Sequence, residues 1–182
     1  MAKTIEQIKA EQFKIQKAVK FLTDACLDSK GNQKIANPKP VVIHSLRVGF
    51  DLLKRDYNND VVVTAILHDL IEDAGVPIAE IKRRFGKKVA EIVEAVSWNE
   101  KIPNHMERFS DTHHRTKEVG RDAVLVSLAD HLDNADYYQY AKSKLTRKMV
   151  LKKWKIFFKE VASLISDEPI YQDYKDKLES IR

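Results

Sequence analysis

A chain of 182 residues, of which 43% are hydrophobic and 32% charged, has the size and composition of one globular domain. Cys26 is its only cysteine, which excludes an internal disulfide and a cysteine-based zinc cluster. The net charge of +5 suits an anionic ligand, although it does not separate a small anion from a nucleic acid.

Strand-like alternation is nearly absent, and most segments repeat their apolar residues with the period of an α-helix. No apolar stretch approaches the roughly 20 residues of a membrane span, and the first residues do not resemble a signal peptide. We therefore predict an all-α fold, a single helical-bundle domain over residues 1–182, in the cytoplasm and without a membrane partner.

The predicted helices follow one another with short breaks. Thr4 and Gln7 can form a capping box at the start of the first helix, and Gly75 can end the third. Residues 99–119 have no clean period and are left without a predicted helix. In chain order, we predict helices over about 4–28, 40–57, 61–74, 77–85, 87–98, 121–140 and 145–165, with a loop at 29–40 that includes Pro38 and a short last helix after Pro169.

The segment 145–165 has the cleanest amphipathic pattern. Its apolar face is formed by Val150, Trp154, Phe157, Val161 and Ile165. Its opposite face is formed by Lys148, Lys152, Lys155 and Lys159. Because no aromatic residues are interleaved with these lysines, we interpret them as a solvated face and expect no nucleic-acid partner.

The most informative motif is His68-Asp69, followed three residues later by Glu72-Asp73, in an otherwise apolar segment. On a continuous helix these four side chains share an arc of roughly 140°, and their apolar neighbours form a core-facing stripe. Carboxylates and an imidazole at the edge of a buried stripe are costly to desolvate unless something pairs with them. A divalent cation is the simplest partner, and a solvated helix end is the alternative for a motif of this kind.

Two further candidate ligands lie on separate predicted helices. His44 stands near the start of one helix and Asp130 within another, both among apolar residues. Two imidazoles and two carboxylates suit one borderline-to-hard divalent ion, with positions left for water and a phosphate oxygen. Mn²⁺ fits this mixture, and Fe²⁺, Zn²⁺ and Co²⁺ are compatible with it. The predicted ligands are His44, His68, Asp69 and Asp130.

A lone His, a His-Asp pair and a distant Asp, in that order, resemble the HD phosphohydrolase superfamily. Over about residues 16–139 the chain is most similar to the hydrolase domain of RelA/SpoT proteins and their small stand-alone relatives, and the predicted C-terminal helices, 145–182, follow this core. The motifs that carry the resemblance are Pro40 before His44, the run from His68 to Asp73, Gly75-Val76, Phe85-Gly86, and Leu128-Ala129-Asp130 with Asn134.

The resemblance implies one Mn²⁺ held by the four predicted ligands, and hydrolysis of the 3′-pyrophosphate of guanosine tetra- and pentaphosphate. It also implies that Glu72 and Asp73 serve water activation and the reacting phosphate, and that Asn134 lies against the nucleotide. Glu72, one turn beyond His68, could act as the general base. Because the chain is too short to add a nucleotidyltransferase domain, we expect it to degrade such a nucleotide rather than make it.

The sequence also departs from the family pattern. In the family, an Arg-Lys pair that contacts the guanine base stands ten to eleven residues before the first metal histidine; here the residues are Gln33 and Lys34. Ser45 replaces a proline, and His131 and Asp133 replace other residue types after the last metal aspartate. The metal residues are intact, and the changes concern base recognition.

Three basic residues are candidate phosphate contacts. Lys34 is one, and Arg115 and Lys117 are chosen by charge alone from a segment that a polar loop also explains. The sequence assigns no role to His105, His113, His114 or His131.

Three functions are compatible with the sequence. The favoured one is the alarmone pyrophosphohydrolase; an HD-type phosphatase for another nucleotide is the second, supported by Gln33. The third is a non-catalytic nucleotide-binding module, against which the complete ligand set counts. A two-metal oxygenase on a similar helical core would need a second ligand set, which we do not find. The sequence does not decide the oligomeric state.

Overall fold

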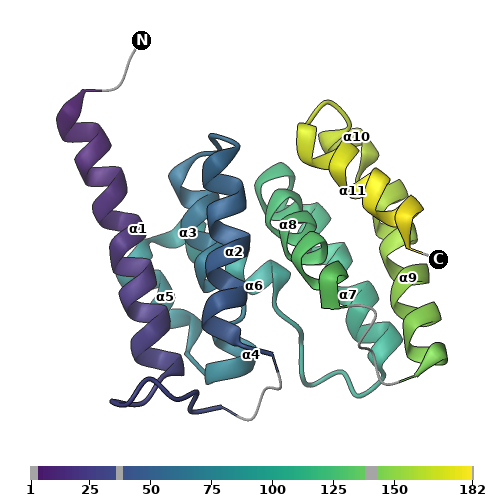
Figure 1. Cartoon of the computed structure of the whole chain (residues 1–182), viewed down its shortest axis with the longest axis horizontal. Coiled ribbons are helices and arrows are strands. Elements are labelled where there is room, and N and C mark those ends of the chain that lie inside the picture. The colour runs from purple at the N-terminus through teal and green to yellow at the C-terminus, as the bar shows by residue number, and fades with distance from the viewer. Residues whose placement is uncertain (1–3, 36–38, 138–142, 182) are drawn as a thin grey trace.

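The computed structural model describes residues 4–35, 39–137 and 143–181, and most of these residues are helical (Figure 1). The helices are α1 (Ile5–Cys26), α2 (Val41–Lys54), α3 (Asn59–Leu67), α4 (Leu70–Ala74), α5 (Ile78–Phe85), α6 (Lys87–Val96), α7 (His105–Val119), α8 (Arg121–Tyr137), α9 (Lys144–Glu160), α10 (Ala162–Ile165) and α11 (Pro169–Ser180). Within these ranges the pairing of Leu27 with Gln33 is an isolated bridge, and no strand forms. The prediction of an all-α fold is confirmed.

Helix α3 is the buried centre of the fold. Every residue from Val61 to Leu67 is buried, and the helix packs against α1, α2, α6 and α8. Helix α2 comes especially close because residue 49 is glycine: a Cβ there would lie 2.5 Å from Cγ1 of Ile66. Helices α10 and α11 pack on α8, and α9 packs against both of them (Figure 1). None of the described helices is both long enough and apolar enough to cross a membrane.

Two helix ends follow their sequence signals. Thr4 Oγ1 accepts the backbone N–H of Gln7 at 3.2 Å, and Gln7 Oε1 accepts that of Thr4 at 2.8 Å, which completes the capping box. Gly75 ends α4 with φ 62° and ψ 26°, a left-handed conformation that favours glycine. The predicted helix end at Tyr140 and the loop residue Pro38 lie outside the described residues.

Two predicted helices are each divided in two, and one helix was not predicted. The single helix predicted over 61–74 is divided into α3 and α4 by a turn at His68 and Asp69. The single helix predicted over 145–165 is divided into α9 and α10 by a turn at Val161. Residues 99–119, where no helix was predicted, contain α7. Most side chains on the buried face of α7 are polar or aromatic, so hydrophobic periodicity does not reveal the helix; this face consists of Phe109, Thr112, His113 and Thr116.

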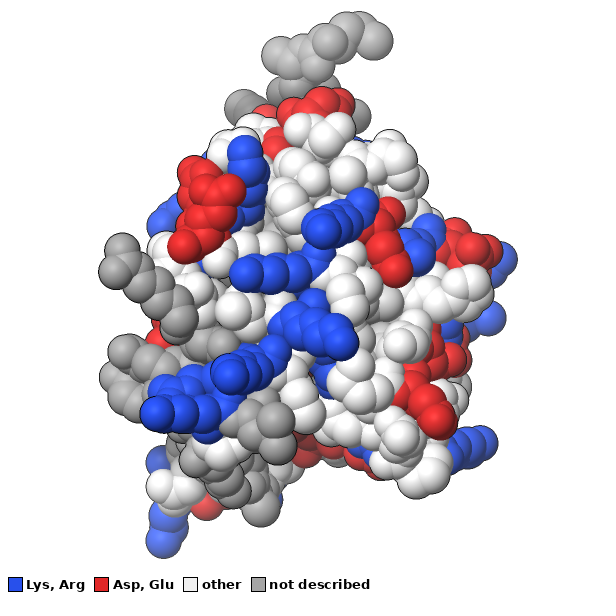
Figure 2. Space-filling view, turned by 90° about the vertical axis from the view of Figure 1, so that its right-hand side faces the viewer, with Lys and Arg blue, Asp and Glu red and all other residues white. Residues whose placement is uncertain are grey.

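Helix α9 follows the predicted amphipathic pattern. Trp154 and Phe157 are buried. On this side of the molecule Figure 2 shows Lys and Arg side chains gathering into a band. The exposed lysines of α9 include Lys148, Lys152, Lys155 and Lys159, whereas Lys153 turns inward and is 2% exposed.

Candidate metal centre and active site

Four side chains from three parts of the chain meet at one point. His44 comes from the first turn of α2, His68 and Asp69 from the turn between α3 and α4, and Asp130 from α8. The Nε2 atoms of the two histidines are 3.3 Å apart. Asp130 Oδ1 lies 3.0 Å from Nε2 of His44 and 3.4 Å from Nε2 of His68. Asp69 reaches the same two nitrogen atoms at 3.5 and 3.1 Å. The structure thus brings together the four residues that the sequence nominates as ligands.

The break between α3 and α4 lets consecutive residues share this centre. In a regular helix, neighbouring side chains point about 100° apart. Asp69 leaves that geometry, with φ −88° and ψ −4°, and its carboxylate can therefore turn towards the ring of His68. Ser97, just beyond the end of α6, supports the turn, because its Oγ lies 3.2 Å from the carbonyl oxygen of His68.

Both imidazoles direct a lone pair to the centre. His68 Nδ1 donates to the carbonyl oxygen of Ala65 at 2.7 Å, since a carbonyl can only accept. His44 Nδ1 donates to Oδ2 of Asp133 at 2.6 Å. In the neutral rings Nε2 is then the acceptor, so two nitrogen lone pairs and two carboxylates face one another. The Nε2 atoms of the two rings and a carboxylate oxygen of Asp130 lie close enough together to hold one divalent metal ion, and the Asp69 carboxylate lies beside them.

The charges at this centre also favour a cation. Burial opposes protonation of His44 and His68, but the neighbouring carboxylates outweigh burial and raise the pKa of both rings. Burial likewise opposes ionisation of Asp130, yet the two imidazole rings beside it hold its pKa well below the usual range. Lys39 Nζ lies 3.1 Å from Oδ2 of Asp69, so a positive group already neighbours the site. No motif in the sequence pointed to this lysine.

Glu72 stands on α4, one turn beyond His68. Its Oε1 accepts the backbone N–H of Trp98 at 2.6 Å. Burial, and then the charge of Asp69, raise the pKa of Glu72 to about 7. A carboxylate with a pKa near neutrality can both accept and return a proton at pH 7. Asp73 follows on the same helix.

A cavity of about 610 Å³ opens beside the centre. Its wall on that side includes His68, Asp130 and Asn134. Much of the remaining wall is aromatic or basic and includes Trp98, Phe109, Tyr137, Lys153 and Trp154. Lys153 Nζ lies 2.6 Å from Nδ1 of His105. The volume of the cavity and its aromatic, basic lining suit an anionic aromatic ligand such as a nucleotide.

His113 and His131, to which the sequence assigned no role, are uncharged residues in the wall of this cavity. His131 Nδ1 lies 3.0 Å from the hydroxyl oxygen of Tyr174, and burial lowers the pKa of His131 to about 4. His113 packs against two phenylalanine rings, and burial lowers its pKa to about 2. His114 is exposed on the outer side of α7.

The residues predicted to contact substrate lie in different places. Asn134 lines the cavity, and its Nδ2 donates to Oδ1 of Asp130 at 2.7 Å, which holds that carboxylate in position. Lys34 Nζ donates to a backbone carbonyl of α1 at 2.6 Å. Lys117 Nζ pairs with Glu160 at 2.9 Å. Neither lysine is among the residues that line the cavity.

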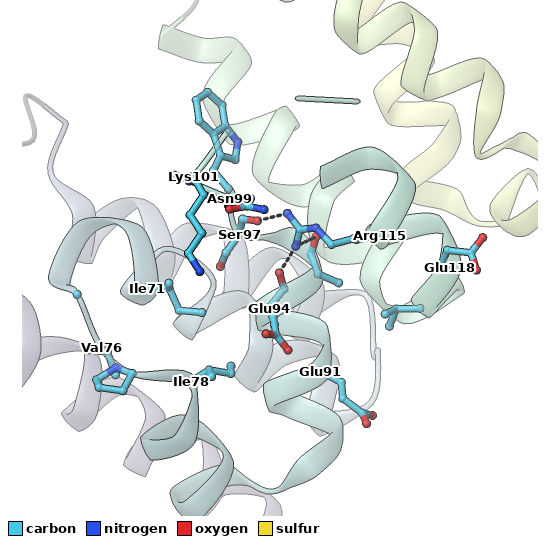
Figure 3. A pocket seen from close by; sticks show the side chains of 15 residues that line it. Ile71, Val76, Ile78, Glu91, Glu94, Ser97, Asn99, Lys101, Arg115 and Glu118 are labelled. Atoms are coloured by element: carbon cyan, nitrogen blue, oxygen red, sulfur yellow. Dashed lines mark hydrogen bonds between the residues drawn. The ribbon is translucent and has the colours of Figure 1, made fainter. Parts of the chain in front are cut away.

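Arg115 caps the C-terminal end of α6 by donating hydrogen bonds to its last carbonyl groups. Its Nη2 donates to the carbonyl oxygen of Ser97 at 2.7 Å, and its Nη1 donates to the carbonyl oxygens of Glu94 and Ala95. Figure 3 shows these contacts beside a groove of about 910 Å³, whose wall includes apolar residues such as Ile71. Although this groove is larger than the 610 Å³ cavity, its lining contains none of the four converging side chains. We therefore place the chemistry in the smaller cavity.

We expect Arg115→Lys to lower stability rather than substrate affinity. A lysine cannot reproduce the fork of donors, so the free energy of unfolding should fall by about 1–3 kcal/mol in urea denaturation, with KM unchanged. Arg83→Lys, at a side chain that is 70% exposed, is the matched control. A raised KM at unchanged stability would show instead that Arg115 contacts substrate.

Gln33 stands where the family pattern has an arginine, and its side chain is hydrogen-bonded within its own loop and to the next helix. Gln33 Oε1 accepts the backbone N–H of Val41 at 3.0 Å, at the start of α2. Gln33 Nε2 donates to the carbonyl oxygen of Ile35 at 3.3 Å. The side chain thus ties the preceding loop to the helix that carries His44.

Comparison with curated proteins relates the chain to enzymes of alarmone metabolism. A guanosine-3′,5′-bis(diphosphate) 3′-pyrophosphohydrolase of Aquifex aeolicus is 33% identical over 122 residues, which are 66% of this chain and 17% of that protein. The bifunctional (p)ppGpp synthase/hydrolase SpoT of Escherichia coli K12 is 28% identical over 103 residues, which are 57% of this chain and 14% of SpoT. The chain therefore spans less than a fifth of the length of these two relatives.

Solved structures share the fold. A metazoan ortholog of SpoT that hydrolyses ppGpp superposes with a TM-score of 0.76 at 19% identity, over 91% of this chain and 94% of that one. A Listeria monocytogenes EGD-e protein superposes with a TM-score of 0.67 at 24% identity, over 81% of this chain and 98% of that one. The sequence profile of the HD domain matches residues 18–162. The chain therefore belongs to the HD-domain family, with homology to the SpoT/RelA (p)ppGpp hydrolases.

Proposed function

We propose that the chain is a metal-dependent phosphohydrolase that releases pyrophosphate from the 3′ position of guanosine tetra- or pentaphosphate. The observation that carries this proposal is the convergence of His44, His68, Asp69 and Asp130 beside a cavity of nucleotide size. The names of several curated relatives, which are guanosine-3′,5′-bis(diphosphate) 3′-pyrophosphohydrolases, support the choice of substrate.

Mn²⁺ is the proposed ion. Two imidazole nitrogens and two carboxylates form a donor set of intermediate hardness, which Mn²⁺ accepts. Held there by the four side chains, the ion would neutralise phosphoryl charge and lower the pKa of a water molecule.

Glu72 is the proposed general base. The N–H of Trp98 fixes one of its oxygens, and a pKa of about 7 lets the carboxylate accept a proton from the attacking water. Attack at phosphorus breaks the bond to the 3′ oxygen of the ribose. The proton held by Glu72 can then pass to that oxygen, which leaves as a hydroxyl group. Asp73, the next residue on α4, is proposed to orient the reacting phosphate through a second water.

The nucleoside is proposed to lie in the 610 Å³ cavity. Trp98, Tyr137 and Trp154 offer aromatic faces for a base, and Lys153 offers a cation to an anionic group. Asn134 lines the same wall, so it can contact the nucleotide while it holds Asp130. Lys34, Arg115 and Lys117 have their own partners on α1, α6 and α9.

Gln33 favours a second candidate, an HD-type phosphatase for a different nucleotide. Its side chain is hydrogen-bonded to the loop and to the start of α2, and an amide cannot replace an arginine as a stacking cation. We also propose that the protein is located in the cytoplasm.

A product assay separates these candidates. Metal-stripped protein is incubated with guanosine tetraphosphate, with and without Mn²⁺, and the nucleotides are separated by anion exchange. Mn²⁺-dependent formation of GDP and pyrophosphate is the expected result. Intact guanosine tetraphosphate, together with Mn²⁺-dependent cleavage of another nucleotide in a parallel panel, would favour the second candidate. No cleavage of any nucleotide would contradict both.

A further inference from the structure

Asp133 links a candidate metal ligand to an arginine. Its Oδ2 accepts Nδ1–H of His44 at 2.6 Å. Arg47 donates to both carboxylate oxygens, from Nε to Oδ1 at 2.5 Å and from Nη2 to Oδ2 at 2.8 Å. Arg47 Nη2 also donates to the hydroxyl oxygen of Tyr137 at 2.8 Å. The side chains of His44, Asp133 and Arg47 are 0%, 11% and 40% exposed, so this chain of hydrogen bonds runs from the core to the surface.

The spacing of these residues explains why they meet. His44 and Arg47 are three residues apart on α2, and Asp130 and Asp133 are three residues apart on α8. Residues with this spacing share a helix face. Because α2 packs against α8, these two faces lie opposite each other. His44 therefore contacts both aspartates, and Arg47 pairs with Asp133.

We propose that Asp133 and Arg47 are positioning residues that hold His44 in the orientation and tautomer that a divalent cation requires. Donation of Nδ1–H to a carboxylate leaves the lone pair on Nε2 and increases the basicity of the ring. The two parallel donors of Arg47 fix the plane of the Asp133 carboxylate. This inference rests on the proposed metal-dependent function, but it concerns cation binding and needs no particular nucleotide.

The second histidine provides an internal comparison. His68 Nδ1 donates to the neutral carbonyl oxygen of Ala65, not to a carboxylate. Changes at Asp133 or Arg47 should therefore alter the ring of His44 and leave the tautomer of His68 as it is.

Cation affinity tests the proposal. Mn²⁺ binding to the metal-stripped full chain is measured by titration calorimetry for the wild type and for Asp133→Asn, Asp133→Ala and Arg47→Gln. We expect binding about tenfold weaker for Asp133→Asn and up to about 100-fold weaker for Asp133→Ala, with a smaller loss for Arg47→Gln. Asp136→Asn is the control, because Asp136 is on the same helix, 70% exposed and paired with Lys177. Wild-type affinity in both Asp133 variants would overturn the proposal.

The tautomer of His44 can be measured directly, and a general loss of protein stability would not change it. In ¹⁵N-resolved NMR of the imidazole rings, neutral His44 should carry its proton on Nδ1 in the wild type and lose that preference in Asp133→Ala. An unchanged tautomer in the variant would contradict the positioning role. If the wild type binds Mn²⁺ and the variants behave as expected but no nucleotide is cleaved, the proposed function fails and the positioning role stands.

Discussion

Asp130→Asn is expected to abolish both cation binding and hydrolysis. Asp130 Oδ1 lies within 3.0 Å of Nε2 of His44 and 3.4 Å of Nε2 of His68, so its charge faces both rings. The amide keeps the shape of the side chain but removes one of the two negative charges that would balance a divalent ion. Because a bound ion supplies several kcal/mol of charge stabilisation, kcat/KM should fall by about 10³-fold or more.

Thermal unfolding with and without Mn²⁺ separates loss of the ion from loss of the fold. At 100 times its Kd, an ion stabilises the native protein by about 2.7 kcal/mol, so the wild type should melt at a higher temperature with Mn²⁺. Asp130→Asn should fold but show no such rise, whereas Asp136→Asn should behave as the wild type does. A Mn²⁺-dependent rise in Asp130→Asn, with activity retained, would remove Asp130 from the proposed ligand set.

Glu72→Gln should stop the reaction while leaving the cation in place. The amide cannot accept the proton of the attacking water, and positioned general bases contribute about 10²–10⁴-fold to rates. We therefore expect kcat to fall by that factor, with Mn²⁺ affinity close to that of the wild type. Glu91→Gln, at an exposed side chain on α6, is the matched control.

The pH profile tests the same assignment. Because a base works only when deprotonated, wild-type kcat/KM should rise with pH as Glu72 ionises. Its pKa of about 7 comes from burial and from the charge of Asp69. A bound cation opposes both causes, so the rise should be centred at or below pH 7. The residual activity of Glu72→Gln should lack this rise, and a retained rise would assign the base to another group.

The fold was largely predictable because most helices have an apolar stripe and clear ends. The capping box of Thr4 and Gln7 and the left-handed Gly75 are local signals that a sequence carries openly. Helix α7 was not predictable in the same way, because Thr112, His113 and Thr116 fill part of its buried face. The division of the third predicted helix was also missed, since nothing in the apolar run before His68 marks a break.

The candidate site was predictable in its residue types but not in its supporting contacts. The order of His44, His68-Asp69 and Asp130 nominated the four side chains that the structure brings together. The hydrogen-bond partners that support these side chains depend on tertiary packing. Asp133 reaches Nδ1 of His44 and pairs with Arg47 only because α2 lies against α8. The matching three-residue spacings on the two helices were the available signal. Charge alone could not show that Arg115 would be directed at backbone carbonyls of α6.

The most direct test of the account is the position of the cation itself. Crystals of the metal-stripped protein would be soaked in Mn²⁺, and an anomalous difference map would be recorded at the manganese absorption edge. We predict one strong peak between the side chains of His44, His68, Asp69 and Asp130, and its absence from crystals of Asp130→Asn. No peak at that point, or a peak bound by other residues, would contradict the account.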